Sequence, residues 1–104
     1  MLAVVKKLRS AEADILEAAE WYDDQKLGLG EDFIRAVNSV IESLATDALL
    51  HRIRFVDVRR AGVKRFWRHG VFYFVHQNEV VVFSVFHGSR HPKWLWEGRQ
   101  EIVP

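Results

Sequence analysis

The residues best suited to chemistry lie in a short stretch, HGSRH, which follows a long apolar run. His87 and His91 carry imidazoles, which titrate near pH 6.5 and can serve as general acid or base at neutral pH. Arg90 could hold a phosphate or stabilise a phosphoryl transition state. Two imidazoles and a guanidinium are suited to metal-independent RNA cleavage, in which a ribose 2′-OH attacks the adjacent phosphate. In the structural alternative, His87 only hydrogen-bonds a loop carbonyl while Gly88 makes a turn.

A second candidate is a run of cations in the second half of the chain. Its members are Arg52, Arg54, Arg59, Arg60, Lys64, Arg65 and Arg68. On strands, where successive side chains point to opposite faces of the sheet, these side chains could line a groove and contact phosphates. Phe66, Trp67 and Phe72 interleave with them and would suit base stacking. The alternative is a solvated sheet face that docks an acidic partner.

A metal site is not expected. His87 and His91 are four residues apart, which suits two ligands on a helix, but Gly88 and Pro92 argue against a helix there. No cysteine or nearby acidic residue completes a tetrahedral set. There is likewise no glycine-rich phosphate loop and no nucleophile elbow. We therefore expect neither a metal nor a cofactor.

Two tryptophans follow this stretch, at Trp94 and Trp96. Spaced two apart, they do not meet as helix neighbours at i and i+4. Either they cover the edge of the core or they lie on a partner surface, where tryptophan is enriched. Both readings remain open.

The core that must position these residues is predicted from two features. Val80–Phe86 is apolar on both sides, so the pattern places it as a strand inside a sheet. Burial of its Val and Phe side chains contributes on the order of 1.5–3 kcal/mol each before entropy is subtracted. Tyr22 and Phe33 lie on apolar helical stripes and are expected in the same core.

The first half of the chain predicts a strand and two helices. Leu2–Leu8 alternates like a strand, and its paired lysines, Lys6 and Lys7, suit the edge of a sheet. Ser10 is a candidate N-cap for a helix from about Ala11 to Gln25. Gly28-Leu29-Gly30 ends it, and a second helix runs from about Glu31 to Ala45. The short turn predicts an antiparallel helical hairpin that covers one face of the sheet.

The second half predicts an antiparallel β-meander. Ile53–Val58 is a strand or an extended segment, and Val63–Arg68 alternates like a strand. His69-Gly70 is a hairpin candidate, Val71–Gln77 is the partner strand, and Asn78-Glu79 turns into the buried strand. The order β-α-α-β-β-β predicts an α+β domain with a mostly antiparallel sheet.

Length and composition place further bounds. The 104 residues suffice for one domain, 1–104, with a tail at 92–104. The chain has no cysteine, which suggests the reducing cytoplasm, and its start lacks the order of a signal peptide. No apolar run approaches the roughly 20 residues of a membrane span.

Charge is unevenly distributed. Residues 1–47 carry five Lys and Arg against ten Asp and Glu, while residues 48–104 carry ten against four. All five histidines also lie in the second part. This polarity suggests a face that meets an anionic partner, although acidic helices that neutralise a basic sheet would have the same pattern.

Several stretches together resemble the RelE/ParE superfamily of type II toxin–antitoxin (plasmid stabilisation) toxins. They are the early strand, AEADILEAAEWYDD, GLGEDFIRAVNSVIESL and VKRFWRHGVFYFVHQNEVVVFSVFHGSRHP. The resemblance covers almost the whole chain and implies a helical hairpin on a mostly antiparallel sheet. It also implies growth inhibition, neutralisation by a small cognate antitoxin encoded beside the toxin, and a toxin–antitoxin hetero-oligomer.

The superfamily contains two activities. RelE-like members cut mRNA on the ribosome, and ParE-like members poison DNA gyrase. The resemblance places His87 at the catalytic position of the ribonucleases and implies that Arg65 or Arg68 matches their sheet arginine. If the chain is a ribonuclease, the candidate catalytic residues are then His87, Arg65, Arg68 and Arg90.

Gly88 stands where several ribonucleases have tyrosine, and the dense lysine cluster of RelE is missing. The HG-x-R-x-P ending favours the ParE-like branch and a non-enzymatic gyrase poison. Arg59, Arg60, Lys64, His91, Trp94 and Trp96 are then candidates for binding. An inactive relic that only binds its antitoxin is a further alternative.

Overall fold

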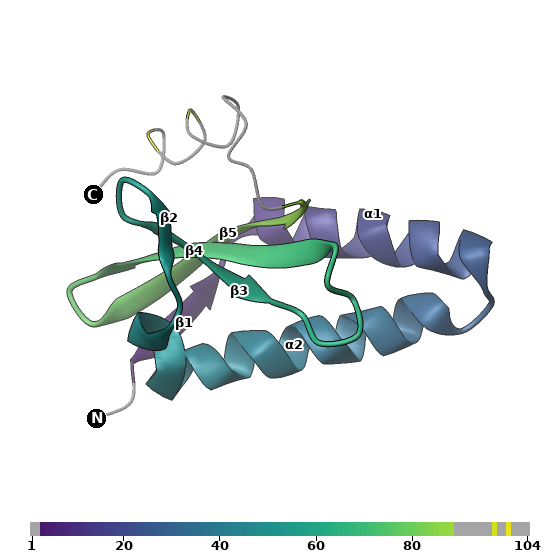
Figure 1. Ribbon diagram of the computed structural model, residues 1–104, viewed down its shortest axis with the longest axis horizontal. Helices are drawn as coiled ribbons and strands as arrows, with labels where there is room; N and C mark the ends of the chain where they lie inside the picture. The colour runs from purple at the N-terminus through teal and green to yellow at the C-terminus, as the bar shows by residue number, and fades with distance from the viewer. Residues whose placement is uncertain (1–2, 89–96, 98–99, 101–104) are drawn as a thin grey trace.

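The computed structural model describes residues 3–88 together with positions 97 and 100. The elements are β1 (Val4–Lys7), α1 (Arg9–Gln25), α2 (Leu29–Asp47), the 3-10 turn η1 (Ala48–Leu50), β2 (Ile53–Phe55), β3 (Val58–Gly62), β4 (His69–His76) and β5 (Glu79–His87). The five strands form one sheet in the order β1-β5-β4-β3-β2. Figure 1 shows α1 and α2 side by side against this sheet. The predicted α+β class with a helical hairpin is confirmed.

Strand β5 lies inside the sheet, between β1 and β4. It runs parallel to β1 and antiparallel to β4. Its side chains are buried on both faces from Val80 to Val85. The prediction from the apolar run is therefore confirmed, and β1 is an edge strand as expected. No helix in the described part of the chain has the length and apolar character that a bilayer crossing requires.

The core has two parts, one on each face of the sheet. The larger part lies between the sheet and the helices, where Tyr22, Phe33 and Tyr73 are buried. On β4, Phe72 and Phe74 stand on either side of Tyr73 in sequence and so point to the opposite face of the sheet. There they form a smaller cluster with Val58, Val81 and Phe83. Tyr22 and Phe33 are thus core residues, as predicted.

The start of α1 differs from the prediction. The helix begins at Arg9, and its N-cap position is Leu8 in an extended conformation. Ser10 lies inside the helix, and its hydroxyl donates to the carbonyl oxygen of Phe83 at 2.7 Å. Ser10 is therefore not the N-cap. Its hydroxyl ties the first turn of α1 to β5 instead.

The hairpin turn between the helices involves two glycines with different roles. Gly28 has φ +90°, a left-handed conformation that favours glycine. Gly30 lies in the first turn of α2, where a Cβ would come within 2.2 Å of the carbonyl oxygen of Ala19. The amide of Gly30 donates to Oδ1 of Asp23 at 2.8 Å. The helices can therefore approach closely at this end.

The predicted strand Val63–Arg68 is wrong. The segment is a loop, and Arg65 has φ +74°. The amide of Phe66 donates to the carbonyl of Val63, and the amide of His69 donates to that of Phe66. Val63 and Phe66 are buried and lie three apart, which is the spacing of a turn and not of a strand. The alternating charges suggested a strand although neither side of it was apolar.

The hairpin positions also differ. His69 and Gly70 open β4 and do not form a turn. The β4–β5 turn has Gln77 and Asn78 at φ +49° and +64°, one residue before the predicted pair. The region Ile53–Val58 divides into β2 and the start of β3, so the helices are followed by four strands.

Candidate binding surface around His87

His87 ends β5 directly opposite the first residue of β4. The pairing register places it beside His69, and the two imidazole centroids are 5.4 Å apart in a near-perpendicular arrangement. His87 is exposed, whereas His69 is buried. The sheet therefore brings together two histidines that are 18 positions apart in sequence, one facing solvent and one facing the core.

His69 is fixed by a partner from α1. A hydrogen bond of 2.9 Å joins its Nδ1 to the hydroxyl of Tyr22. The pKa of His69 is lowered from 6.5 to about 4. Burial is the largest cause, and the neighbouring His87 and Arg60 add to it. Burial also raises the pKa of Tyr22. His69 is thus neutral at physiological pH, and its pKa is poorly matched to proton transfer near pH 7.

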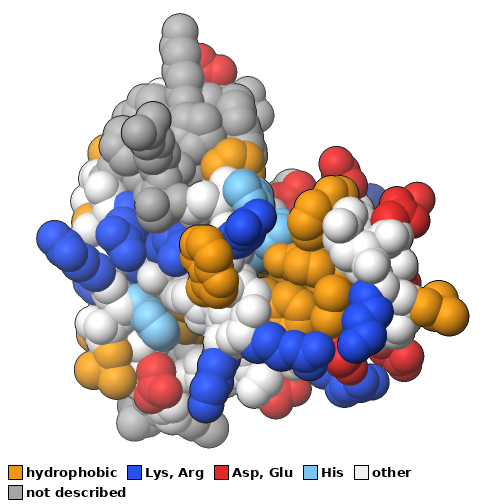
Figure 2. Space-filling view, turned by 45° about the vertical axis from the view of Figure 1, so that its right-hand side comes forward, with side chains coloured by type: hydrophobic (Ala, Val, Ile, Leu, Met, Phe, Trp, Pro, Cys, Tyr) orange, Lys and Arg blue, Asp and Glu red, His pale blue; other side chains and the backbone are white. Residues whose placement is uncertain are grey.

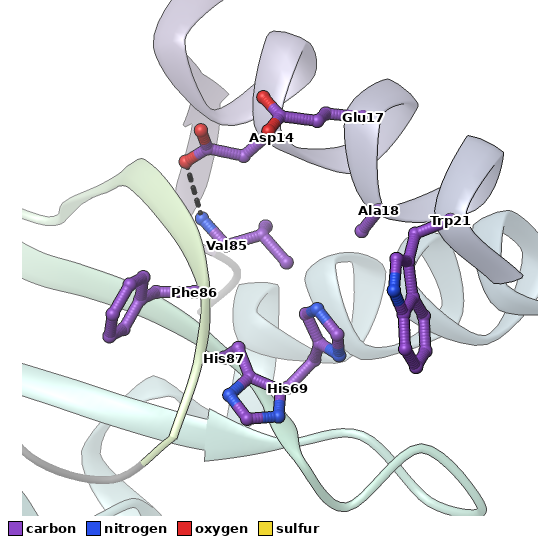
Figure 3. Close-up of a pocket in the computed structure, with 8 residues that line it drawn as sticks. All are labelled: Asp14, Glu17, Ala18, Trp21, His69, Val85, Phe86 and His87. Carbon is purple, nitrogen blue, oxygen red and sulfur yellow. Dashed lines mark hydrogen bonds between the residues drawn. The ribbon is translucent and has the colours of Figure 1, made fainter.

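A hollow of about 500 Å³ opens between α1 and the end of β5, and we call it the α1 hollow. Its lining residues are Asp14, Glu17, Ala18, Trp21, His69, Val85, Phe86 and His87. Figure 3 shows the α1 side chains on one side of it and the two imidazoles on the other. Asp14 accepts from the amide of Val85 at 3.1 Å and from the hydroxyl of Ser84, and its burial raises its pKa.

A second hollow of about 320 Å³, the arginine hollow, lies on the other side of His87. It is lined by Arg60, Trp67, Arg68, His87 and Gly88. Trp67 is 72% exposed, and the guanidinium of Arg68 lies 5.1 Å from the centroid of its indole ring. This hollow combines cations with an exposed aromatic ring.

A third hollow of about 240 Å³, the tryptophan hollow, joins the other two. Its lining residues are Trp21, Tyr22, Gln25, Leu29, Arg65, Phe66, Trp67 and Arg68. It shares Trp21 with the α1 hollow and shares Trp67 and Arg68 with the arginine hollow. Figure 2 shows apolar side chains with histidine beside them and Lys and Arg side chains around them. The three hollows are therefore neighbours that share these side chains.

Arg60 holds the end of β5 in place. Its Nε donates to the carbonyl oxygen of Gly88 at 3.0 Å, and its Nη2 donates to that of Trp67 at 3.3 Å. The amide of Gly88 in turn donates to the carbonyl of Arg68 at 2.6 Å. Burial lowers the pKa of Arg60. One half-buried guanidinium therefore connects β3, the 63–68 loop and the end of β5.

The other predicted cations are dispersed. Arg59 donates to the carbonyl oxygens of Leu49 and His51. Arg65 pairs with Asp32 at 3.2 Å. Lys64, Arg52 and Arg54 are exposed, and Lys64 lines none of the three hollows. Among the predicted site residues that the structure describes, Arg60, Arg68 and His87 meet in the arginine hollow. Arg65 joins Arg68 in the tryptophan hollow.

The proposed stacking residues divide between core and surface. Phe66 and Phe72 are 5% and 0% exposed, so neither can stack on a base, and that prediction is wrong for both. Phe66 packs against Tyr22 and Phe33, with centroids 5.0 and 5.3 Å away. Trp67 alone of the three is available on the surface.

Four predicted site residues lie outside the described residues. They are Arg90, His91, Trp94 and Trp96. Within the described part of the chain, no group of three or more His, Asp or Glu side chains is placed to hold a metal ion.

Two residues of the surface escaped sequence reasoning. Trp21, 48% exposed on α1, lines two hollows, and His69 lies beside His87 in the sheet and not in the predicted hairpin turn. Trp21 had a signal in the sequence, because it precedes the apolar stripe residue Tyr22 and so points away from the core. His69 had none, since its place follows from the strand register alone.

Three comparisons bear on this chain. A family model described as the ParE toxin of the type II toxin–antitoxin system parDE matches residues 5–92. Nine chains of solved structures match. One, described as the chromosomal ParDE TA system from P. aeruginosa, has a TM-score of 0.74 and 15% identity, over 84% of this chain and 97% of that one. No curated protein sequence matches.

Proposed function

Since the chain belongs to the ParE toxin family of type II toxin–antitoxin systems, we propose that it inhibits growth by binding DNA gyrase through the surface around His87. A cognate antitoxin neutralises it in this proposal. The family makes the chain the toxin component of such a module. The gyrase target and the neutralisation are what the proposal adds.

The observation that carries the proposal is the joining of three hollows around Trp21, Trp67, Arg68 and His87. Tryptophan and arginine dominate the energetics of protein interfaces because they bury large areas and form several contacts each. Here Trp21 is about half exposed and Trp67 is largely exposed. A surface of this composition suits binding to a protein.

The buried histidine of the same surface is not poised for proton transfer near neutral pH. The pKa of His69, about 4, is far below neutral. Arg60 and Arg65 are already engaged, one with backbone carbonyls and the other with Asp32. These contacts support binding over catalysis.

A ribosome-dependent mRNA endoribonuclease is the second candidate. One observation favours it: His87 shares the arginine hollow with two guanidinium groups, Arg60 and Arg68. An imidazole next to cations is a reasonable arrangement for phosphoryl chemistry.

Induced expression with DNA, RNA and protein synthesis followed over time separates the candidates. Early arrest of replication with an SOS response, and inhibition of purified gyrase, support the proposal. Cuts in translated mRNA with intact replication overturn it in favour of the ribonuclease. Absence of growth arrest overturns both and leaves a relic that only binds its antitoxin.

Substitutions sharpen the test. Trp67→Ala and Arg68→Ala should each weaken gyrase inhibition about tenfold or more, as truncation of interface anchors does. Leu27→Ala and Arg35→Ala are the matched controls, on an exposed turn and an exposed helix face. His87→Ala should have a modest effect on gyrase binding, whereas loss of a general base in a ribonuclease would cost roughly 10²–10⁴-fold.

A further inference from the structure

A second exposed apolar region lies at the β2 edge of the sheet. Leu49, Leu50, Ile53 and Val56 are 68%, 81%, 47% and 67% exposed. They are four of the nine large hydrophobic side chains that are exposed among the described residues, and all fall within eight positions. Single exposed hydrophobics are normal, but a cluster marks an interaction site. We call residues 49–56 the edge surface.

The backbone of this segment is held firmly. Arg59 Nη1 donates to the carbonyl oxygens of His51 at 2.6 Å and Leu49 at 3.4 Å. The hydroxyl of buried Tyr73 donates to the carbonyl of Ala48. Two side chains from the sheet therefore anchor three carbonyls. The apolar side chains are presented in an ordered arrangement, which reduces the entropy lost on binding.

The edge surface is also open on one side. β2 is the last strand of the sheet and pairs with β3, with Ile53 opposite Arg59 and Phe55 opposite Val58. Figure 1 shows β2 at the end of the sheet that lies away from the α1–α2 turn. An edge strand offers backbone donors and acceptors to an extended segment.

Charge determines which partner fits. Arg52 and Arg54 flank Ile53 and are exposed, and residues 48–56 contain no acidic side chain. An incoming segment that alternates carboxylates with apolar side chains would pair with both arginines and cover the hydrophobic cluster. A basic or purely apolar segment would not.

We propose that the edge surface is the docking site for an acidic, amphipathic segment of the antitoxin, separate from the surface around His87. This rests on the proposed toxin–antitoxin function. β3 separates the two surfaces, with β2 at its start and the 63–68 loop at its end. Five residues of strand correspond to about 15 Å. Target binding and antitoxin binding therefore use different side chains.

The test uses the full chain and, as probe, the purified protein encoded by the neighbouring reading frame. Binding is measured by titration calorimetry for Leu50→Ser and for the double variant Arg52→Glu/Arg54→Glu. Each should weaken binding at least about tenfold, and the charge reversal should also reduce the salt dependence of the affinity. Thermal unfolding checks that each variant is folded.

Leu27→Ser and Lys26→Glu are the matched controls, because both side chains are exposed at the hairpin turn. Both should bind within about twofold of the wild type, as substitutions outside an interface do. In cells, the edge variants should stay toxic and escape rescue by co-expressed antitoxin. This pairing of retained toxicity with lost rescue is specific to a docking site.

Three results overturn the inference. Edge variants that bind like the wild type, with Trp67→Ala abolishing binding, place the antitoxin on the surface around His87 and leave the proposed function intact. A dimer of the free chain that dissociates with Leu50→Ser assigns the edge to a second copy. A wild-type chain that neither arrests growth nor binds the probe removes the proposed function and the inference together.

Discussion

Arg60 crosses the sheet directly over Gly70. A Cβ at Gly70 would lie 2.2 Å from Arg60 Nε and 2.7 Å from its Cγ and Cζ. The missing side chain at this position thus makes room for a guanidinium that reaches the carbonyl of Gly88. Gly70 is required by a close approach between side chain and backbone, and not by a turn.

We predict that Gly70→Ala displaces Arg60 and breaks its bond to Gly88. The expected loss is about 1–3 kcal/mol of unfolding free energy, from overpacking and the lost charged hydrogen bond. Denaturant unfolding measures it. Gly62→Ala is the control, since the nearest atom to its Cβ is 3.9 Å away. Two results would show that Gly70 does not make room for Arg60. One is a Gly70→Ala variant as stable as the wild type. The other is a double variant with Arg60→Ala in which Gly70→Ala still causes its full loss of unfolding free energy.

His69 leads to a prediction about pH. Its pKa is about 4 in the folded chain and about 6.5 when unfolded. As pH falls from about 6.5 to about 4, the unfolded chain takes up a proton that the native chain excludes, so the unfolding free energy decreases. Below about pH 4 both states bind the proton, and His69 causes no further decrease. The neighbours that face it are Tyr22, His87 and Arg60.

The check compares the wild type with His69→Gln. The difference in their unfolding free energies should shrink as pH decreases from 7 to 4, because only the wild type loses the contribution of His69. The exposed residue His76 provides the control substitution His76→Gln. A difference that stays constant over this range would contradict the assignment.

At the scale of elements, a side-chain hydrogen bond spans the turn of the helical hairpin. Asp23 on α1 accepts from the amide of Gly30 in the first turn of α2. The first amides of a helix have no partner within it, and this carboxylate satisfies one. No N-cap side chain does so for α2, because the N-cap residue is Gly28.

We therefore expect Asp23→Ala to lower the unfolding free energy by about 1 kcal/mol. Asp24→Ala, the exposed neighbour, should change it by less than about 0.5 kcal/mol. Thermal or urea unfolding distinguishes them. Equal effects of the two substitutions would mean that the loss of negative charge on α1, and not the capping contact, controls stability.

On the scale of the whole molecule, the described residues present an exposed apolar region at each end of β3. The surface around His87 combines indoles, imidazoles and guanidiniums, and the edge surface combines aliphatic side chains with Arg52 and Arg54. The acidic residues of the chain are concentrated on the helices. The surface around His87 therefore extends onto α1 through Trp21, whereas the edge surface lies wholly in the basic second half of the chain.

Additivity tests this division. In the double variant Trp67→Ala/Leu50→Ser, gyrase inhibition should match that of Trp67→Ala and antitoxin affinity should match that of Leu50→Ser. Changes at sites more than about 7–10 Å apart without shared partners usually add within about 0.3–0.5 kcal/mol. Inhibition assays and calorimetry on the four chains measure both. A strong coupling between the two changes would indicate one shared surface.

The sequence by itself determined the fold class, the buried strand, the helical hairpin and the family. The fold class, the strand and the hairpin follow from local periodicity: a run that is apolar on both faces must be interior, and stripes at three- and four-residue spacing must cover it. The family follows from the resemblance of several stretches, which the family model confirms. The sequence also indicated His87, Arg60 and Arg68, because they occur beside the last strand and within the basic run.

Tertiary structure alone decided which of these residues meet. The pairing of β4 with β5 places His69 beside His87, and Gly70 lets Arg60 reach Gly88. It also buried Phe66 and Phe72 and directed Arg59 to backbone carbonyls. Strand register and side-chain reach depend on contacts between residues far apart in sequence, and no local pattern encodes them.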